Sequence, residues 1–376
     1  MLSAHEIAGP VVRALLTRAQ INASDVDAVI VGNALGAGGN PARMLALAAG
    51  LPERCPAYSI DTQCCAGLDA MTMAAGLLAS GNASVVVVGG VEAWSRSPIR
   101  QHRPLRAGDP GIPYERPAFS PDPQRDPDML MAAANYAALH GYTRVDQDRY
   151  AMLSHARALA SAHALEAEIV PVLGVSADTC PRHLVPERVA RMPTVVTAAL
   201  MPEAGAGGIN ASSATDPQHY ALSRLAISPK ADGAAFIVMA TAQACERMGL
   251  RPRMAWLGGA SVGCAPDVPM LAAIDASRAV LTRCGTSMAH MTAIELHDAF
   301  AVQALSFCDA FSLRWEQVNR RGGGLARGHP IGASAAIALV RLLEDLAKGD
   351  VPDAMGLAAV AGAGGIGAAA VIKRLV

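Results

Sequence analysis

The stretch Gln63-Cys64-Cys65-Ala66-Gly67-Leu68 opens an apolar helix pattern that runs to Ala79. The strand-like run Ser84-Val85-Val86-Val87-Val88 and the pair Gly89-Gly90 follow it directly. Upstream, Val26–Val31 also reads as a buried strand between two helix patterns. Strands that alternate with helices in this way predict a mostly parallel sheet covered by helices.

The same order of elements returns near the other end of the chain. A Gly-rich loop leads into the helix pattern Gly332–Ala347, the strand pattern Ala354–Val360 follows, and glycines cluster over Gly362–Gly367. Self-similarity of this kind predicts a duplicated αβ unit, one copy in each half of the chain.

Between the two copies, from about Ser95 to Ser228, the alternation breaks down. Val145–Ala164 reads as a single amphipathic helix within this region. The segment before that helix is irregular because it is rich in proline, at Pro98, Pro104, Pro110, Pro113, Pro117, Pro121, Pro123 and Pro127. We expect an inserted region that lies over the sheet layers and covers a site.

Composition narrows the class of protein. The 376 residues carry a formal net charge of −1, and 52% are hydrophobic but only 4% aromatic. This length allows two or three domains, and the balanced charge favours neither nucleic acid nor a membrane surface as partner. The eight cysteines are irregularly spaced without a C-x-x-C pair, which predicts neither a metal site nor a disulfide framework. With no secretory pattern at the N-terminus, a reducing cytoplasm fits best.

Three segments suggest chemistry. Cys64 lies at a helix start, where unpaired N–H groups and the helix dipole favour a thiolate, which is the nucleophilic form of cysteine. His297 and His329 could supply the base and the oxyanion donor that such a nucleophile needs. Gly328 and Pro330 flank His329, so a close backbone approach and a fixed turn are expected there.

These residues also carry a family resemblance. Cys64-Cys65-Ala66-Gly67-Leu68 resembles the Cys-x-Ser-Gly-Leu nucleophile motif of thiolases, and Gly328–Ser334 is similar to their Gly-His-Pro loop. Further matches follow in the family's order: Gly32-Asn33 with Asn40–Arg43, Gly89–Glu92 with Ser95–Pro98, Ser228 before Asp232–Ala235, and Gly364–Gly367. The resemblance therefore covers nearly the whole chain.

The resemblance implies a thiolase fold of two βαβαβ halves in a five-layered α/β/α/β/α arrangement. It implies an N-terminal half at 1–98 that 226–243 completes, a loop domain at 99–225 that covers the acyl-CoA site, and a C-terminal half at 244–376. Cys64 would be the acylated nucleophile and His329 its base, while Ser228 would lie near the pantetheine arm of coenzyme A. Coenzyme A would be a substrate rather than a permanently bound cofactor, and the chain would form a homodimer or homotetramer.

One departure concerns His297-Asp298-Ala299-Phe300, which stands where thiolases usually have Asn-Glu-Ala-Phe. This version resembles the sterol-carrier-protein-linked branch, which implies that His297 donates to the oxyanion. Together with Cys64 and His329 it also resembles the Cys-His-His set of decarboxylating ketoacyl synthases. A purely structural alternative is an ion pair between His297 and Asp298.

Two other departures are absences. Ala361 and Ala299 occupy the positions at which thiolases usually carry a second, proton-shuttling cysteine. Either a histidine does its work, or decarboxylation makes it unnecessary, or the chain is a non-catalytic thiolase-like subunit. Thiolases also usually place a strand ahead of the helix that here begins near Ala4, and a misassigned start codon is the simplest hypothesis for its absence.

Overall fold

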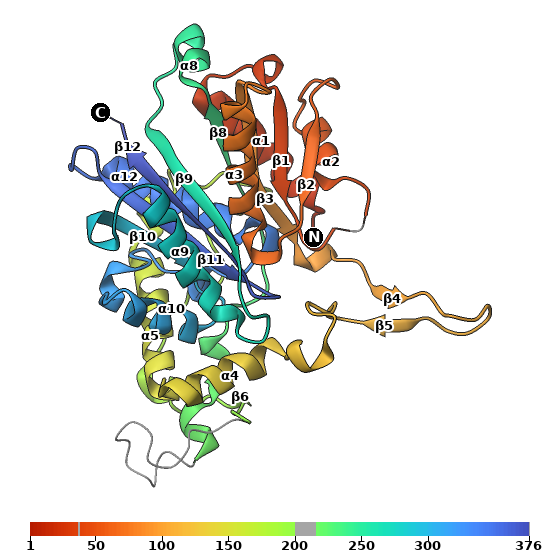
Figure 1. Cartoon of the computed structure of the whole chain (residues 1–376), viewed down its shortest axis with the longest axis vertical. Helices are drawn as coiled ribbons and strands as arrows, with labels where there is room; N and C mark the ends of the chain where they lie inside the picture. Colours follow the sequence, from red (N-terminus) through yellow and green to blue (C-terminus); the bar gives the residue numbers. More distant parts are fainter. Residues whose placement is uncertain (37, 200–215, 376) are drawn as a thin grey trace.

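The computed structural model of the chain describes residues 1–36, 38–199 and 216–375. Two four-stranded sheets form its core and lie side by side in Figure 1. The N-terminal sheet has the order β2-β1-β3-β8 and is built from β1 (Ala28–Gly32), β2 (Ala57–Ile60), β3 (Val85–Ala93) and β8 (Asp232–Ala240). β1 is parallel to both of its neighbours, whereas β8 is antiparallel to β3.

The C-terminal sheet has the order β10-β11-β12-β9, with β9 (Met254–Gly263), β10 (Met291–His297), β11 (Met355–Gly362) and β12 (Ile366–Arg374). Only β10 and β11 are parallel in it; β12 is antiparallel to both β11 and β9. The mostly parallel sheet that the sequence predicts for the first half is confirmed in the N-terminal sheet, whereas the C-terminal sheet is mostly antiparallel. The tight turn at Gly364 and Gly365, both in the left-handed region, folds β12 back against β11.

Helices complete five layers. α1 (Ala4–Ala19) and α2 (Pro41–Ala48) cover the outer face of the N-terminal sheet, and α9 (Ala272–Arg283) and α10 (Ala301–Ala310) cover the outer face of the C-terminal sheet. α3 (Ala66–Ala79) and α12 (Ser334–Lys348) lie between the two sheets in one hydrophobic cluster. Successive strand residues alternate between faces, so Ile30 faces the middle layer while Val29 and Val31 face α1 and α2.

The duplicated αβ unit agrees with this arrangement. α3 leads to β3 in one half, and α12 leads to β11 in the other. Each helix begins through a short 3₁₀ turn, Gln63–Cys65 before α3 and Ile331–Ala333 before α12, and neither helix start has a capping side chain. Both turns approach the same region between the sheets.

The region between the halves is more ordered than the sequence suggests. It contains the hairpin β4 (Arg100–His102) and β5 (Ile112–Tyr114), which projects from the body in Figure 1, where irregular chain was expected. The expected helix Val145–Ala164 is divided at Ser161 into α5 (Arg144–Ala160) and α6 (Ala162–Leu165). The other helices and strands of this region are α4 (Met129–His140), α7 (Pro186–Val189), β6 (Thr194–Val196) and β7 (Leu222–Ser223). Outside it, the chain also forms α8 (Ala242–Met248) and α11 (Gly324–Arg327).

Four glycines allow the halves to meet backbone to backbone. Gly32, Gly67 and Gly90 of the N-terminal half surround Gly332 of the C-terminal half. A Cβ atom on Gly332 would lie 2.6 Å from the Cα atom of Asn33, a distance that side chains do not tolerate. This glycine junction brings the turns before α3 and α12 together.

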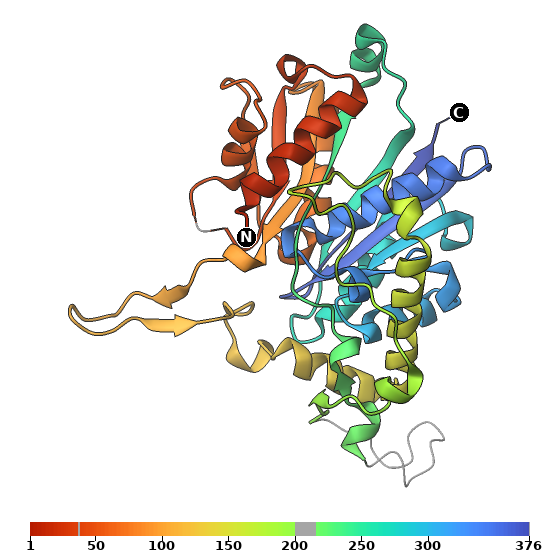
Figure 2. The same cartoon turned by 180° about the vertical axis from the view of Figure 1, so that it is seen from behind.

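β8 and β12 occupy corresponding places, because each is antiparallel to the strand that follows a middle-layer helix, but the two sheets differ beyond them. β12 has strands on both sides, but β8 pairs only with β3 in the described part of the chain. A cavity of about 880 Å³ lies along the other side of β8, between α1, α12 and the segment near 168–180. Figure 2 shows this face, where the yellow-green segment crosses the blue α12. The strand expected ahead of α1 has no counterpart in the described residues. Within them, none of the helices has the length and apolar character needed to cross a membrane.

Candidate active site

The nucleophile candidate lies in the 3₁₀ turn Gln63–Cys65, directly after β2 and before α3. Gln63 adopts a left-handed conformation, with φ of 53°, which is unfavourable for a residue with a side chain. Its backbone N–H and its side-chain amide both donate to Asp61 Oδ1, at 3.0 and 2.9 Å, and these bonds offset the strain. The turn places Cys64 between the sheets, where only 9% of the residue is exposed.

Cys64 contacts a histidine from the other half of the chain. Its Sγ lies 3.1 Å from His329 Nε2, and His329 Nδ1 lies 2.6 Å from Ser334 Oγ. The Ser334 hydroxyl donates its proton to the carbonyl of Pro330 at 3.0 Å, so its oxygen accepts from Nδ1–H. This assigns the neutral tautomer of His329 and leaves the Nε2 lone pair facing the thiol.

Burial makes this pair neutral. It raises the pKa of the Cys64 thiol to about 12, although backbone N–H groups of Ala363 and of Cys64 itself oppose the shift. It lowers the pKa of His329 to about 4. Burial therefore acts against the thiolate that the helix start favours. Cys64 can become nucleophilic only as His329 takes its proton.

The His329 loop is fixed on both sides. The backbone N–H of His329 donates to the carbonyl of Pro229 at 2.7 Å, and its own carbonyl accepts from Trp94 Nε1 at 2.8 Å. Lys230 lies over the Trp94 ring, 4.5 Å from its centre, and so supports the tryptophan. The imidazole is thus oriented by both the backbone and Ser334.

His297 ends β10 and packs against His329, with ring centres 4.3 Å apart and planes at 35°. It is 5% exposed, and its Nε2 has no hydrogen-bond partner among the described residues. Burial first, and then the nearby His329 and Arg327, lower the His297 pKa well below its usual value. A second neutral imidazole therefore lies beside His329, with one nitrogen uncommitted.

Asp298 does not form the ion pair with His297 that the sequence left open. Its Oδ1 accepts a hydrogen bond from the backbone N–H of Gly324 instead. Burial raises the pKa of Asp298 to about 6. Gly324 lies against the His297 ring, since a Cβ atom there would be 2.7 Å from His297 Cε1. Through its bond to Gly324, Asp298 therefore fixes the backbone segment that packs against the His297 ring.

Ser228 also contacts the Gly324 segment that packs against His297. Its hydroxyl donates to the carbonyl of Gly324 at 2.6 Å, and its backbone N–H donates to the carbonyl of Ala299 at 2.8 Å. The structure thus places Ser228 next to the His297 segment, in a partly buried position. Its expected contact with pantetheine stays a prediction.

Glu92, a buried carboxylate at the end of β3, is a member of the site that its sequence pattern did not single out. Its Oε1 accepts from Asn33 Nδ2 at 2.9 Å and from the Leu35 N–H at 3.1 Å. Its Oε2 accepts from the Ala34 N–H at 2.9 Å and from the Gly332 N–H at 3.0 Å. Glu92 therefore ties the loop after β1 to the His329 loop. Its only signal in the sequence was its place in the Gly89–Glu92 match.

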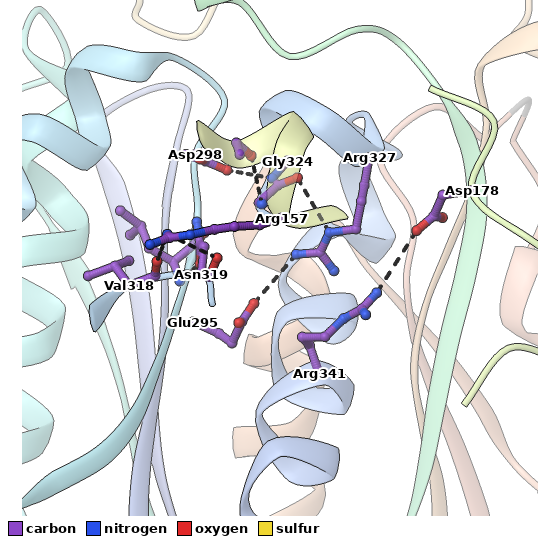
Figure 3. A network of polar contacts seen from close by, with 12 residues as sticks. Arg157, Asp178, Glu295, Asp298, Val318, Asn319, Gly324, Arg327 and Arg341 are labelled. Carbon is purple, nitrogen blue, oxygen red and sulfur yellow. Dashed lines mark hydrogen bonds and ion pairs between the residues drawn. The ribbon is translucent and has the colours of Figure 1, made fainter. Parts of the chain in front are cut away.

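Largely buried charged side chains lie near the His297 segment, and Figure 3 shows Glu295, Asp298, Arg327 and Arg341 among them. Arg327 contacts Glu295 at 3.4 Å, and its Nε donates to the carbonyl of Gly323 at 3.3 Å. Burial raises the pKa of Glu295 to about 8, and the charge of Arg327 opposes that shift. Arg341 on α12 pairs with Glu168 at 2.6 Å. Through its bond to the Gly323 carbonyl, Arg327 supports the short helix α11, which leads into the His329 loop.

The positions expected for a second cysteine hold Ala361, in β11, and Ala299. Cys65 is fully buried, and its Sγ lies 3.9 Å from the Val360 carbonyl oxygen, on the β11 side of the turn. No cluster of three or more His, Cys, Asp or Glu side chains suited to a metal ion occurs among the described residues. The arrangement provides a buried thiol, a base hydrogen-bonded to it and a second imidazole, which is the equipment of covalent acyl transfer.

Comparisons with known proteins agree with this chemistry. The family model described as thiolase, N-terminal domain, matches residues 1–200, and that described as thiolase, C-terminal domain, matches residues 250–374. A putative acetyl-CoA C-acetyltransferase of Bacillus subtilis is 33% identical over 374 residues, covering 98% of this chain and 93% of that protein. An acetyl-CoA acetyltransferase of Allochromatium vinosum is 33% identical over 393 residues, covering 100% and 94%.

Solved structures give the same result. The Acat5 thiolase of Ascaris suum, determined in complex with coenzyme A, has a TM-score of 0.83 at 27% identity and covers 99% of this chain and 94% of its own. The acetyl-CoA acetyltransferase of Bacillus anthracis has a TM-score of 0.86 at 28% identity and covers 100% and 93%. The similarity extends over both sheets and the region between them.

Proposed function

Because the chain belongs to the thiolase family and is an acyltransferase, we propose that it transfers acyl groups between Cys64 and coenzyme A. The reaction is thiolysis of a 3-ketoacyl-CoA or, in reverse, Claisen condensation of acyl-CoA units. The observation that carries this proposal is the 3.1 Å contact between Cys64 Sγ and a His329 Nε2 whose lone pair is oriented by Ser334. Ser228 is the residue we assign to the pantetheine arm.

In the first half-reaction His329 Nε2 takes the proton of Cys64 as sulfur attacks the 3-keto carbon. The backbone N–H groups of Ala363 and Cys64, which oppose the rise in the Cys64 pKa, favour the negative charge on Sγ as it loses its proton, and that charge passes to the keto oxygen on attack. Collapse of the tetrahedral adduct breaks the Cα–Cβ bond and leaves acyl-Cys64 with an acetyl-CoA enolate. In the second half-reaction His329 deprotonates coenzyme A, whose sulfur takes the acyl group and releases Cys64.

The enolate needs a proton, which thiolases usually receive from the second cysteine. We assign this step to the imidazole pair, because His297 lies 4.3 Å from His329, ring centre to ring centre, with an uncommitted Nε2. The same nitrogen is suited to donate to the substrate oxyanion when it carries a proton. Donation from His297 to the oxyanion is what the resemblance to the sterol-carrier-protein-linked branch implies.

Decarboxylative condensation is a second candidate, favoured by the same two imidazoles beside Cys64. Loss of carbon dioxide from a malonyl-type donor generates the carbanion directly, so no group has to remove an α-proton. Alanine at positions 361 and 299 is then no handicap. The third candidate, a non-catalytic subunit, needs none of the contacts between Cys64 and His329.

Intact-mass spectrometry after incubation with acetyl-CoA tests the proposal. We expect one labile acetyl adduct on the wild type and none on Cys64→Ala, with Cys55→Ala as a matched buried-cysteine control that still reacts. Absence of an adduct on the wild type would refute the proposal and favour the non-catalytic subunit. Cleavage of acetoacetyl-CoA, compared with carbon dioxide release from malonyl-CoA, then separates thiolysis from decarboxylative condensation.

We also propose that copies of the chain associate as a dimer or tetramer in the cytoplasm. Support comes from the open edge of β2, where Tyr58 is 48% exposed, and from the projecting hairpin, where Leu105 is fully exposed. Light scattering on the purified protein checks the mass in solution, and a monomer at micromolar concentration would contradict the proposal.

A further inference from the structure

Another buried carboxylate, Asp69 in the first turn of α3, lies next to the nucleophile turn. Its Oδ2 accepts from the Thr62 hydroxyl at 2.6 Å, and its Oδ1 accepts from the Ser261 hydroxyl. Thr62 immediately precedes the turn that holds Cys64, whereas Ser261 belongs to β9 of the other half. Asp69 thus connects the nucleophile turn to the C-terminal sheet.

This carboxylate has an unusual environment. It is 8% exposed, and no arginine, lysine or histidine pairs with it among the described residues. Burial raises its pKa, and the two hydroxyl hydrogen bonds are what oppose that shift. Burying a carboxylate without a cationic partner costs free energy. The hydrogen bonds from Thr62 and Ser261 offset part of that cost and fix the orientation of the carboxylate.

Thr62 controls the geometry of the turn that follows it. Its carbonyl accepts the Cys65 N–H at 3.1 Å, and the next residue is the left-handed Gln63. A strained turn of this kind persists only when its surroundings hold it in place. The hydroxyl of Thr62, anchored on Asp69, fixes the end of the turn onto the rigid helix α3.

The far side of the clamp leads to the other partner of Cys64. Ser261 is paired with Ala368 on β12, the strand that follows the turn containing Ala363. The Ala363 N–H is one of the two backbone groups that oppose the rise in the Cys64 pKa. Asp69 is therefore linked through Thr62 to the turn that holds Cys64, and through Ser261 and its strand pairing to the turn that contains Ala363.

We propose that Asp69 is a positioning residue, which acts through Thr62 to hold Cys64 Sγ within reach of His329 Nε2 and the Ala363 N–H. The inference rests on the proposed function, because it takes Cys64 as the nucleophile. Asp69 touches no reacting atom; it determines where the sulfur lies. The Ser261 hydroxyl orients the carboxylate, while α3 is held against β9 by packing along its length.

The informative variant is Thr62→Val, which keeps the shape and removes the hydroxyl. We expect the rate of Cys64 acetylation by acetyl-CoA to fall about 10- to 100-fold, as for small displacements of a reacting group, with little change in KM. Alkylation of Cys64 by iodoacetamide should change in parallel. Thr62→Ser restores the hydroxyl and should restore both rates.

Thr72→Val is the matched control, because it removes a threonine hydroxyl from the same helix, where that hydroxyl donates to the carbonyl of Leu68 at 3.2 Å rather than to Asp69. It should keep acetylation within about threefold of the wild type. Equal rate losses in the two variants, or a wild-type rate in Thr62→Val, would overturn the positioning role. If the wild type acquires no acetyl adduct, the proposed function fails, whereas the iodoacetamide rates still decide whether Thr62 positions Cys64.

Discussion

Replacement of Glu92 by glutamine tests whether one buried carboxylate holds the site together. The wild-type side chain gives two hydrogen bonds to each oxygen: Asn33 Nδ2 and the Leu35 N–H on Oε1, and the Ala34 and Gly332 N–H groups on Oε2. Glutamine keeps the shape but has a single oxygen, and its NH₂ group then faces two donors. Whichever way the amide turns, two N–H groups lose their acceptor.

The expected loss of stability follows from that count. A buried donor left unpaired costs about 1–3 kcal/mol, so two cost about 2–6 kcal/mol. The neutral amide also avoids the burial penalty that raises the pKa of Glu92, which moves the expected value toward the lower end. Even so, the loss is a large part of the roughly 5–15 kcal/mol that stabilises a typical domain.

Urea unfolding at pH 7.5 measures this difference. The Glu92→Gln variant should unfold at a lower urea midpoint with an unchanged slope, and Cys64 acetylation should slow because Gly332 lies three residues beyond His329. Glu115→Gln is the control, since Glu115 pairs with Lys230 at 3.0 Å but has 86% of its side chain exposed. A Glu92→Gln stability within about 0.5 kcal/mol of the wild type would refute the reasoning.

Two further predictions concern ionisation at the nucleophile. Ser334→Ala removes the acceptor of the His329 Nδ1–H, so the imidazole can adopt the other tautomer, and acetylation should fall about 10²-fold while the melting temperature changes little; an unchanged rate would contradict the assigned tautomer. Because the pKa of Cys64 is raised to about 12, alkylation of Cys64 by iodoacetamide in a His329→Ala variant, which lacks the base, should rise about tenfold per pH unit from 7 to 10. A rate that is independent of pH in this variant would contradict the raised pKa, because it would show a thiol that is already ionised.

The layered fold could be predicted largely because its signals are local. Apolar runs such as Val85–Val88 and the glycine-flanked helices have the periods of strands and helices, and their repetition indicates two similar halves. The antiparallel return of β12 could not be read in this way, because it depends on a turn of a few glycines. The projecting hairpin was missed because prolines in and around it, such as Pro113 opposite Gln101, obscure a strand pattern.

The candidate site was predictable in its membership but not in its state. Cys64 and His329 are 265 residues apart, and only the ordered matches to a family placed them together. Their ionisation depends on how completely two halves exclude water, which no local pattern records. Glu92 and Asp69 were overlooked for the same reason, since a single acidic residue in a sequence does not show whether it will be buried. Their donors come from segments far away along the chain.

The absent second cysteine changes the geometry of the proposed reaction more than its proton balance. Thiolysis removes one proton from Cys64 and delivers one proton to the departing enolate, so a single imidazole that carries the proton across suffices for the balance. His329 is held by Ser334 at 2.6 Å and faces Cys64, which restricts how far it can turn toward the α-carbon of the substrate. His297 has no such restraint on its Nε2 and lies against His329. For the proposed reaction we therefore assign the placement of this proton to His297, whose Nε2 has no hydrogen-bond partner among the described residues.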